Sequence, residues 1–94
     1  MPLRGFWAPV TPEHVNQATA EFDQLGRDAF LGRYGFGRAN RFLLTAGGRD
    51  YDSKAILGAA YGYATGTPLS PRQFSGGTAG AAGVLRRLGF TVRD

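Results

Sequence analysis

Apolar residues recur at spacings of three and four over the first third of the chain, which predicts amphipathic helices. The first apolar stripe consists of Val15, Ala18, Phe22 and Leu25. Thr11 can cap this helix, Pro12 suits its first turn, and Gly26 ends it. A second, shorter helix from Asp28 onward completes a predicted helical hairpin over residues 11–35.

The rest of the chain predicts a small sheet and two further helices. Residues 41–51 contain a Gly-Gly pair between two short strand-like runs, which is typical of a β-hairpin. Apolar stripes predict helices over 53–64 and 78–88, and a last strand follows at 90–92. We therefore expect a single domain over residues 1–94, of the α/β (α+β) class, with a three-stranded antiparallel sheet packed on helices.

Composition limits the kinds of protein that this chain can be. The 94 residues include no cysteine, which removes disulfides, cysteine zinc sites and thiol nucleophiles. No run of about 18 apolar residues is present to span a bilayer, and the start of the chain lacks the apolar core of a signal peptide. We expect a cytoplasmic protein with no membrane partner.

The charge of the chain is positive and is carried mainly by arginine. Eleven Lys and Arg residues against seven Asp and Glu residues give a formal net charge of +4, and ten of the eleven cations are Arg. Guanidinium groups suit bidentate contacts with phosphate or guanine, so this balance favours a nucleic-acid partner. The alternative is a solvated surface with a compositional bias for Arg, and charge alone does not separate the two interpretations.

The sequence offers little catalytic chemistry. His14 is the only histidine, and no cysteine or carboxylate cluster lies near it at metal-ligand spacing. Residues 35–37 read Gly-Phe-Gly, but position 40 is Asn and no strand precedes the motif, so it is not a dinucleotide fingerprint. We expect no catalytic residues, no metal and no cofactor.

Two motif blocks contain the polar residues best suited to bind a ligand. Residues 49–54 read Arg-Asp-Tyr-Asp-Ser-Lys where the hairpin enters the third helix, and residues 72–77 read Arg-Gln-Phe-Ser-Gly-Gly before the fourth. Glycine amides at the start of a helix can hold a phosphate. The structural alternatives are that Tyr51 packs in the core, that Ser53 caps the helix, and that the glycines form a tight turn.

The order of these motifs, over nearly the whole chain, resembles the N-terminal head domain of ScoMcrA-type HNH endonucleases. The most specific matches are the runs Tyr51-Asp52-Ser53-Lys54-Ala55-Ile56 and Phe74-Ser75-Gly76-Gly77. Weaker matches are Leu25-Gly26-Arg27, Phe30-Leu31, Tyr34-Gly35-Phe36 and Leu88-Gly89-Phe90. The resemblance implies that DNA cleavage belongs to a separate HNH domain and that recognition of methylated or phosphorothioate DNA belongs to separate reader domains. For this chain it implies a non-catalytic accessory module.

We therefore predict a DNA-binding module associated with a modification-dependent (type IV) restriction endonuclease, which would serve phage defence. Its expected partners are DNA and HNH nuclease or reader domains. The candidate DNA-binding residues are Arg49, Tyr51, Ser53, Lys54, Arg72, Gln73, Ser75, Gly76 and Gly77. We expect their two blocks to share one edge of the domain. The alternative is a module that docks or dimerises the nuclease without touching DNA, and a stand-alone enzyme is the least favoured hypothesis.

Overall fold

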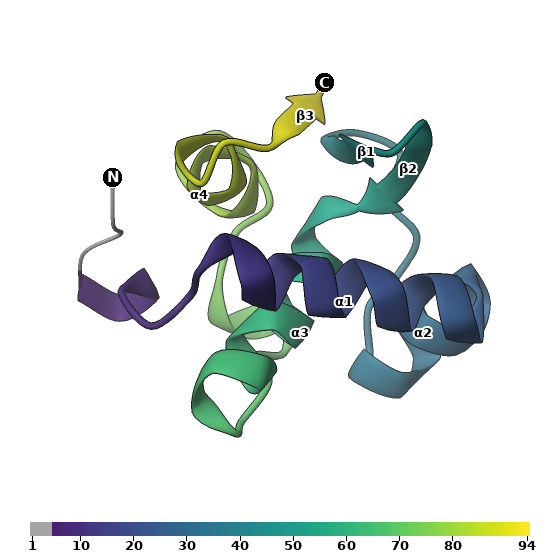
Figure 1. The fold of residues 1–94 in the computed structure, drawn as a ribbon, viewed down its shortest axis with the longest axis horizontal. Helices are drawn as coiled ribbons and strands as arrows, with labels where there is room; N and C mark the ends of the chain where they lie inside the picture. The colour runs from purple at the N-terminus through teal and green to yellow at the C-terminus, as the bar shows by residue number, and fades with distance from the viewer. Residues whose placement is uncertain (1–4) are drawn as a thin grey trace.

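The structure is a computed structural model that describes residues 5–94. Over these residues the chain forms four α-helices, two short 3-10 helices and one three-stranded antiparallel sheet (Figure 1), which confirms the predicted α+β class. In chain order the elements are η1 (Gly5–Trp7), α1 (Pro12–Leu25), α2 (Arg27–Tyr34), β1 (Leu43–Ala46), β2 (Arg49–Asp52), α3 (Ser53–Thr65), η2 (Pro71–Gln73), α4 (Ala81–Arg87) and β3 (Thr91–Arg93).

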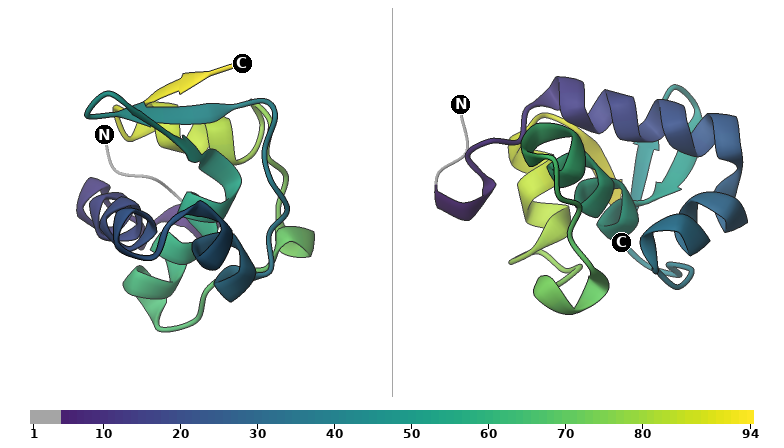
Figure 2. Two further views of the ribbon diagram at one scale, coloured as in Figure 1. Left: turned by 90° about the vertical axis from the view of Figure 1, so that its right-hand side faces the viewer. Right: turned by 90° about the horizontal axis from the view of Figure 1, so that it is seen from below.

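Helix α3 forms the centre of the fold. Residues 53–60 are all buried except Lys54, and α1, α2 and α4 each pack against this helix (Figures 1 and 2). A helix that is apolar on nearly every side is stable only when neighbours cover it. Several of its buried residues are Ala or Gly, which lets those neighbours approach closely. One close approach is at Gly58, where an added Cβ would lie 2.8 Å from the Phe36 ring and 2.9 Å from the carbonyl oxygen of Leu69.

The helical hairpin forms where its apolar stripe predicted it. Val15, Ala18 and Phe22 face the core from α1, and α2 contributes Phe30 and Leu31. The side chain of His14 accepts a hydrogen bond from the Thr11 amide at 3.0 Å through Nδ1. The single histidine therefore closes the first turn of α1.

The sheet places one residue of each strand against the helices. Strand β1 lies between β2 and β3, and Leu44 is opposite both Tyr51 and Val92. All three side chains are buried. Gly47 and Gly48 form the two-residue turn with φ of 59° and 78°, the positive values that a type I′ hairpin requires.

Helix α4 begins at Ala81, three residues after the predicted start at 78. The amides of Ala81 and Ala82 donate to the carbonyl oxygens of Ser75 and Gly76, at 2.9 and 3.4 Å. Gly80 has φ −125° and ψ −127°, which is not helical. Residues 75–80 therefore fold as a turn that leads into the helix.

Glu21 joins the three helices α1, α2 and α3. Its Oε1 accepts hydrogen bonds from the hydroxyls of Tyr34, at 2.6 Å, and Tyr63, at 2.8 Å. Its Oε2 lies 3.3 Å from Nε of Arg33. Burial and then the hydrogen bond to Glu21 raise the pKa of Tyr34 above the ordinary value of tyrosine.

The close approach at Gly58 predicts that Gly58→Ala destabilises the domain. The added methyl group must push aside the Phe36 ring or the Leu69 backbone, and such overpacking costs about 1–3 kcal/mol. Gly32→Ala is the matched control, because Gly32 is exposed within α2 and a Cβ there meets nothing within 4 Å. It should stabilise the helix by about 0.5–1 kcal/mol. Urea unfolding measures both, and equal effects of the two substitutions would contradict this packing.

The raised pKa of Tyr34 predicts an alkaline loss of stability. In the unfolded chain the hydroxyl ionises near pH 10, about the ordinary value for tyrosine, whereas in the folded chain it stays protonated. The free energy of unfolding therefore falls as the pH rises above about 10, by at most about 1.4 kcal/mol per pH unit from this group. Denaturant unfolding across that range should show a shallower fall for Tyr34→Phe, and parallel curves for the two proteins would refute the assignment.

Candidate nucleic-acid interface

Six arginines are neutralised by carboxylates within residues 5–94. The ion pairs are Arg27–Asp52, Arg33–Glu21, Arg38–Asp28, Arg49–Asp23, Arg86–Asp94 and Arg93–Asp50. Four other cations in the same residues form no ion pair, and these are Arg41, Lys54, Arg72 and Arg87. The uncompensated positive charge of the described chain lies on these four side chains.

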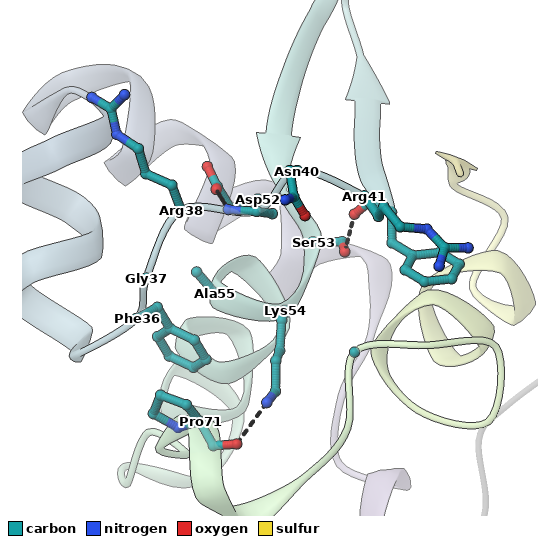
Figure 3. Close-up of a pocket in the computed structure, with 13 residues that line it drawn as sticks. Phe36, Gly37, Arg38, Asn40, Arg41, Asp52, Ser53, Lys54, Ala55 and Pro71 are labelled. Carbon is teal, nitrogen blue, oxygen red and sulfur yellow. Dashed lines mark hydrogen bonds between the residues drawn. The ribbon is translucent and has the colours of Figure 1, made fainter.

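Arg41 and Lys54 line a pocket of about 360 Å³ at the N-terminal end of α3 (Figure 3). One wall is the segment 36–42, which connects α2 to β1 without regular secondary structure. Pro71 and Gly76 line the pocket from the loop that precedes α4. Arg72 follows Pro71 on η2 and is exposed. Three of the four unpaired cations thus line the pocket or adjoin it in sequence.

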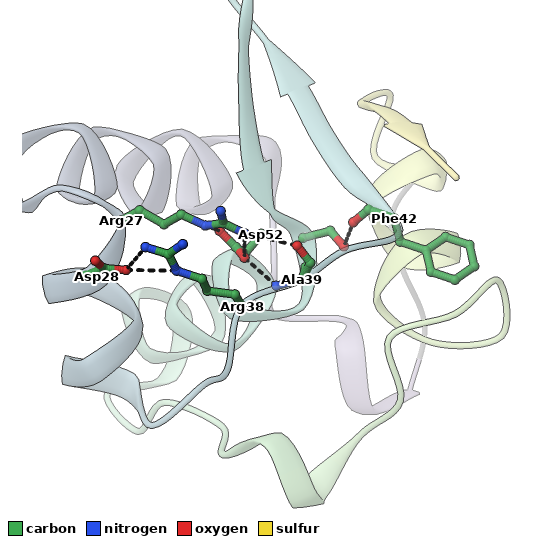
Figure 4. Close-up of polar contacts among 7 residues, drawn as sticks. Arg27, Asp28, Arg38, Ala39, Phe42 and Asp52 are labelled. Atoms are coloured by element: carbon green, nitrogen blue, oxygen red, sulfur yellow. Dashed lines mark hydrogen bonds and ion pairs between the residues drawn. The ribbon is translucent and has the colours of Figure 1, made fainter.

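A buried carboxylate holds the wall segment in place. Asp52 is 2% exposed and accepts hydrogen bonds from Nε and Nη2 of Arg27, at 2.9 and 2.8 Å, and from the amide of Ala39, at 2.7 Å (Figure 4). The same Nη2 of Arg27 donates to the carbonyl of Ala39 at 3.0 Å. Both backbone groups of Ala39 are therefore fixed, and the wall is tied at its middle to α2 and to the start of α3.

The wall ends at a strained residue. Phe42 has φ of 56°, a left-handed value that is rare for an aromatic residue and costs about 1–3 kcal/mol. Its carbonyl oxygen accepts a hydrogen bond from the buried hydroxyl of Ser53. The guanidinium carbon of Arg41 lies 4.8 Å from the centroid of the Phe42 ring. This turn is why β1 begins at Leu43 and not at the predicted residue 41, and it positions Arg41 beside the pocket.

Most of the wall's backbone is left without internal partners. Within the described residues, the amides and carbonyls of four wall residues form no hydrogen bond with the protein, and these are Gly37, Arg38, Asn40 and Arg41. Because all four residues are exposed and line the pocket, water can reach and satisfy these backbone groups in the free protein. A ligand in the pocket can replace that water.

Lys54 crosses the pocket between the two predicted motif blocks. Its Nζ donates to the carbonyl oxygen of Pro71 at 2.6 Å and lies 5.2 Å from the centroid of the Phe74 ring. A Cβ added at Gly76 would lie 3.5 Å from Cδ of Lys54. The structure therefore brings Lys54, Ser53 and Gly76 of the predicted set together in one pocket.

The other members of the first block lie elsewhere. Tyr51 is 4% exposed, and its hydroxyl donates to both oxygens of Asp23, at 2.9 and 3.0 Å. Arg49 is exposed at the hairpin turn and pairs with the same carboxylate at 3.0 Å. Tyr51 thus packs in the core, which was the structural alternative to a binding role. Arg49 is separated from the pocket by the length of β2.

The second block is used mainly for turns. The side chain of Gln73 accepts a hydrogen bond from the amide of Ser70 at 2.8 Å, which closes η2. Ser75 is exposed, but its carbonyl and that of Gly76 already bind the first amides of α4. Those helix amides are not free for a phosphate, so the structure favours the tight-turn alternative for Ser75, Gly76 and Gly77.

Sequence reasoning missed the wall residues Arg38, Asn40 and Arg41. The Gly-Phe-Gly motif at 35–37 predicted only the end of α2. The segment after it has no periodic pattern of apolar residues that would indicate a helix or a strand. The available signal was a polar, basic run between two regular elements, since such connections often carry binding residues.

Other ligand classes have less support in the described residues. Within residues 5–94 no cluster of three or more His, Asp or Glu side chains could hold a metal ion. In the same part of the chain, no helix combines the length and the apolar character needed to cross a membrane.

Comparison with known proteins identifies relatives of this domain. The sequence profile of the family described as "ScoMcrA-like, N-terminal head domain" matches residues 8–94. A solved structure of the type IV phosphorothioation-dependent restriction endonuclease ScoMcrA is similar to the fold, with a TM-score of 0.67 and 35% sequence identity. That match covers 92% of this chain and 13% of the endonuclease chain. No curated protein sequence matches.

The position of Asp52 predicts a large effect of Asp52→Ala on stability. The substitution removes the hydrogen bonds of the half-buried Ala39 amide and of Arg27 to the carboxylate, and hydrogen bonds to a charged group contribute about 1.5–3 kcal/mol. Asp28→Ala is the control, since it removes an ion pair with Arg38 in which both side chains are largely exposed. Such pairs contribute about 0–1 kcal/mol. Thermal or urea unfolding compares the two, and an Asp52→Ala protein as stable as Asp28→Ala would contradict the anchoring role.

Proposed function

The chain belongs to the family of ScoMcrA-like N-terminal head domains, and from this premise we propose that it is a non-catalytic DNA-binding module of a type IV restriction system. The similar endonuclease is a phosphorothioation-dependent enzyme, and this chain corresponds to 13% of its length. In this proposal, cleavage belongs to a separate HNH domain, and the module works beside it.

The observation that carries the proposal is the distribution of unpaired cations. Arg41, Lys54 and Arg72 lie at or beside one pocket. Of the six arginines that pair with carboxylates within residues 5–94, only Arg38 lines this pocket, and the others are distributed over the rest of the domain. A protein that binds DNA gains affinity when its cations replace condensed counterions on phosphates. Cations already neutralised by carboxylates contribute much less to such binding.

The local geometry suits phosphate. Arg41 is a planar donor whose position is restricted by its contact with the Phe42 ring, and a restricted side chain loses less entropy on binding. Lys54 uses one of its three donors for the Pro71 carbonyl and keeps the others for a ligand. Arg72 adds an exposed charge on the adjoining turn.

A second candidate function is docking to another domain of a nuclease, and exposed aromatic residues favour it. Phe6 is 53% exposed and stacks on Tyr61 with ring centroids 4.9 Å apart. Trp7 packs against both rings. This cluster is formed by η1 and α3 and includes none of the residues that line the pocket, so substitutions can test the two functions separately.

The proposal predicts salt-dependent binding of DNA. Three phosphate contacts give a slope of about −2.7 in a plot of log affinity against log salt concentration for duplex DNA. Arg41→Gln or Arg72→Gln should weaken binding and make the slope shallower by about 0.9, because each removes one contact. Fluorescence anisotropy of labelled duplexes that are unmodified, methylated or phosphorothioated measures affinity, slope and any preference for a modification.

Arg87→Gln is the matched control for this titration. Arg87 is also exposed and unpaired within residues 5–94, but it lies on α4 and does not line the pocket. It changes the net charge by the same amount, so it should leave the slope nearly unchanged. Equal losses for Arg41→Gln and Arg87→Gln would show that net charge, and not the pocket, binds DNA. No binding to any probe at low salt would reject the function and favour docking.

A further inference from the structure

We infer that the pocket accepts one unstacked nucleotide, so that the domain binds single-stranded or locally unpaired DNA in preference to intact duplex. This inference rests on the proposed function and specifies the form of its ligand. It follows from three properties of the pocket: its two-walled shape, the chemistry of its walls and the position of its cations.

The pocket is a partly open cleft with protein on two sides. The segment 36–42 forms one wall, residues of the loop before α4 form the other, and the first turn of α3 lies between them (Figure 3). In a duplex each base is covered by its neighbours on both faces and by its pairing partner at its edge. A space between two walls can receive a base only after that base has left the stack.

The walls combine apolar surface with free hydrogen-bonding groups. Figure 3 shows Pro71 beside Lys54, where it offers apolar surface to the flat face of a base. Asn40 and the unpaired backbone groups of Gly37 and Arg41 lie on the wall segment. A nucleobase presents donors and acceptors along its edge, so it matches a wall of this kind. A surface that only contacted phosphates would need neither feature.

The cations lie where the phosphate of such a nucleotide would be. Arg41 and Lys54 line the same cavity as the apolar and amide groups, from different elements of the fold. One cleft therefore offers partners for a base and for its phosphate. Proteins that bind single strands without strict sequence preference use this combination of a basic groove and surfaces on which bases stack.

Two neighbouring glycines allow the cavity to be blocked without changing charge. A side chain added at Gly76 points toward Lys54 across the pocket, where its Cβ would lie 3.5 Å from Cδ. A Cβ added at Gly77 meets nothing within 4 Å, and Gly77 does not line the pocket. Neither residue has a positive φ, so both tolerate a side chain. Gly76→Leu should fill the pocket, and Gly77→Leu is its matched control.

The experiment compares three probes of one sequence: a single strand, a perfect duplex, and a duplex with a single unpaired 2-aminopurine. Anisotropy gives the affinities, and 2-aminopurine fluorescence reports unstacking of the unpaired base. We expect the single strand and the bulged duplex to bind at least about tenfold more tightly than the perfect duplex, since stacking contributes strongly for each base. Gly76→Leu should remove this preference and the fluorescence change, while Gly77→Leu keeps both.

The outcomes separate this inference from the proposed function. Equal affinity for all three probes, or an unchanged preference in Gly76→Leu, would overturn the nucleotide pocket while leaving salt-dependent DNA binding intact. Arg41→Lys distinguishes further, because it keeps the charge but loses the planar group, and it should reduce the preference more than the salt slope. Absence of binding to every probe would overturn both conclusions together.

Discussion

The carboxylate of Asp52 is the interaction on which the arrangement of the domain depends. It stands where β2 becomes α3, and it binds Arg27 at the start of α2 and the backbone of Ala39 in the connecting segment. One buried group therefore joins the helical hairpin, the sheet and the central helix. A carboxylate removed from water in this way is stable only when its oxygens are fully bonded, and here a guanidinium and an amide meet that need.

This contact has a functional consequence because Ala39 lies in the middle of the pocket wall. Both backbone groups of Ala39 are bonded, which fixes the path of the residues on either side. Their polar groups stay exposed, and Phe42 is held in a strained conformation at the end of the wall. Strain of this kind persists only where surrounding contacts enforce it. The core of the fold thus stabilises an open polar wall that local sequence preferences would not maintain.

The fold was predictable from sequence because its elements depend on local patterns. The apolar stripe of α1, the Gly47-Gly48 turn and the run of small residues in α3 each act within a few positions. The start of α4 was not predicted correctly. The chain forms a turn where the first helical turn was expected, and the carbonyls of Ser75 and Gly76 accept the first helix amides. The pocket wall was also missed, since Arg27 and Asp52 are 25 residues apart and no periodicity records their pairing.

The candidate site was predicted only in part for a related reason. A short run with several distinctive residues can contain residues that the fold requires and residues that touch a ligand. The sequence alone does not distinguish these two roles. Within one block, Tyr51 packs in the core, Ser53 holds the Phe42 carbonyl, and only Lys54 extends across the pocket. The unpaired state of Arg41 and Arg72 could be recognised only after the ion pairs of the other arginines were known in space.

The small number of available cations also bears on how such a module would act. About three phosphate contacts give modest affinity that physiological salt weakens strongly. A module of this kind is effective when it is linked to other DNA-binding domains, because linkage raises its effective concentration near the DNA they hold. The match to a segment that makes up 13% of a restriction endonuclease fits that mode of action. Weak binding by the isolated domain is therefore what the proposed function requires, since a head domain that bound all DNA tightly would compete with recognition of the modification.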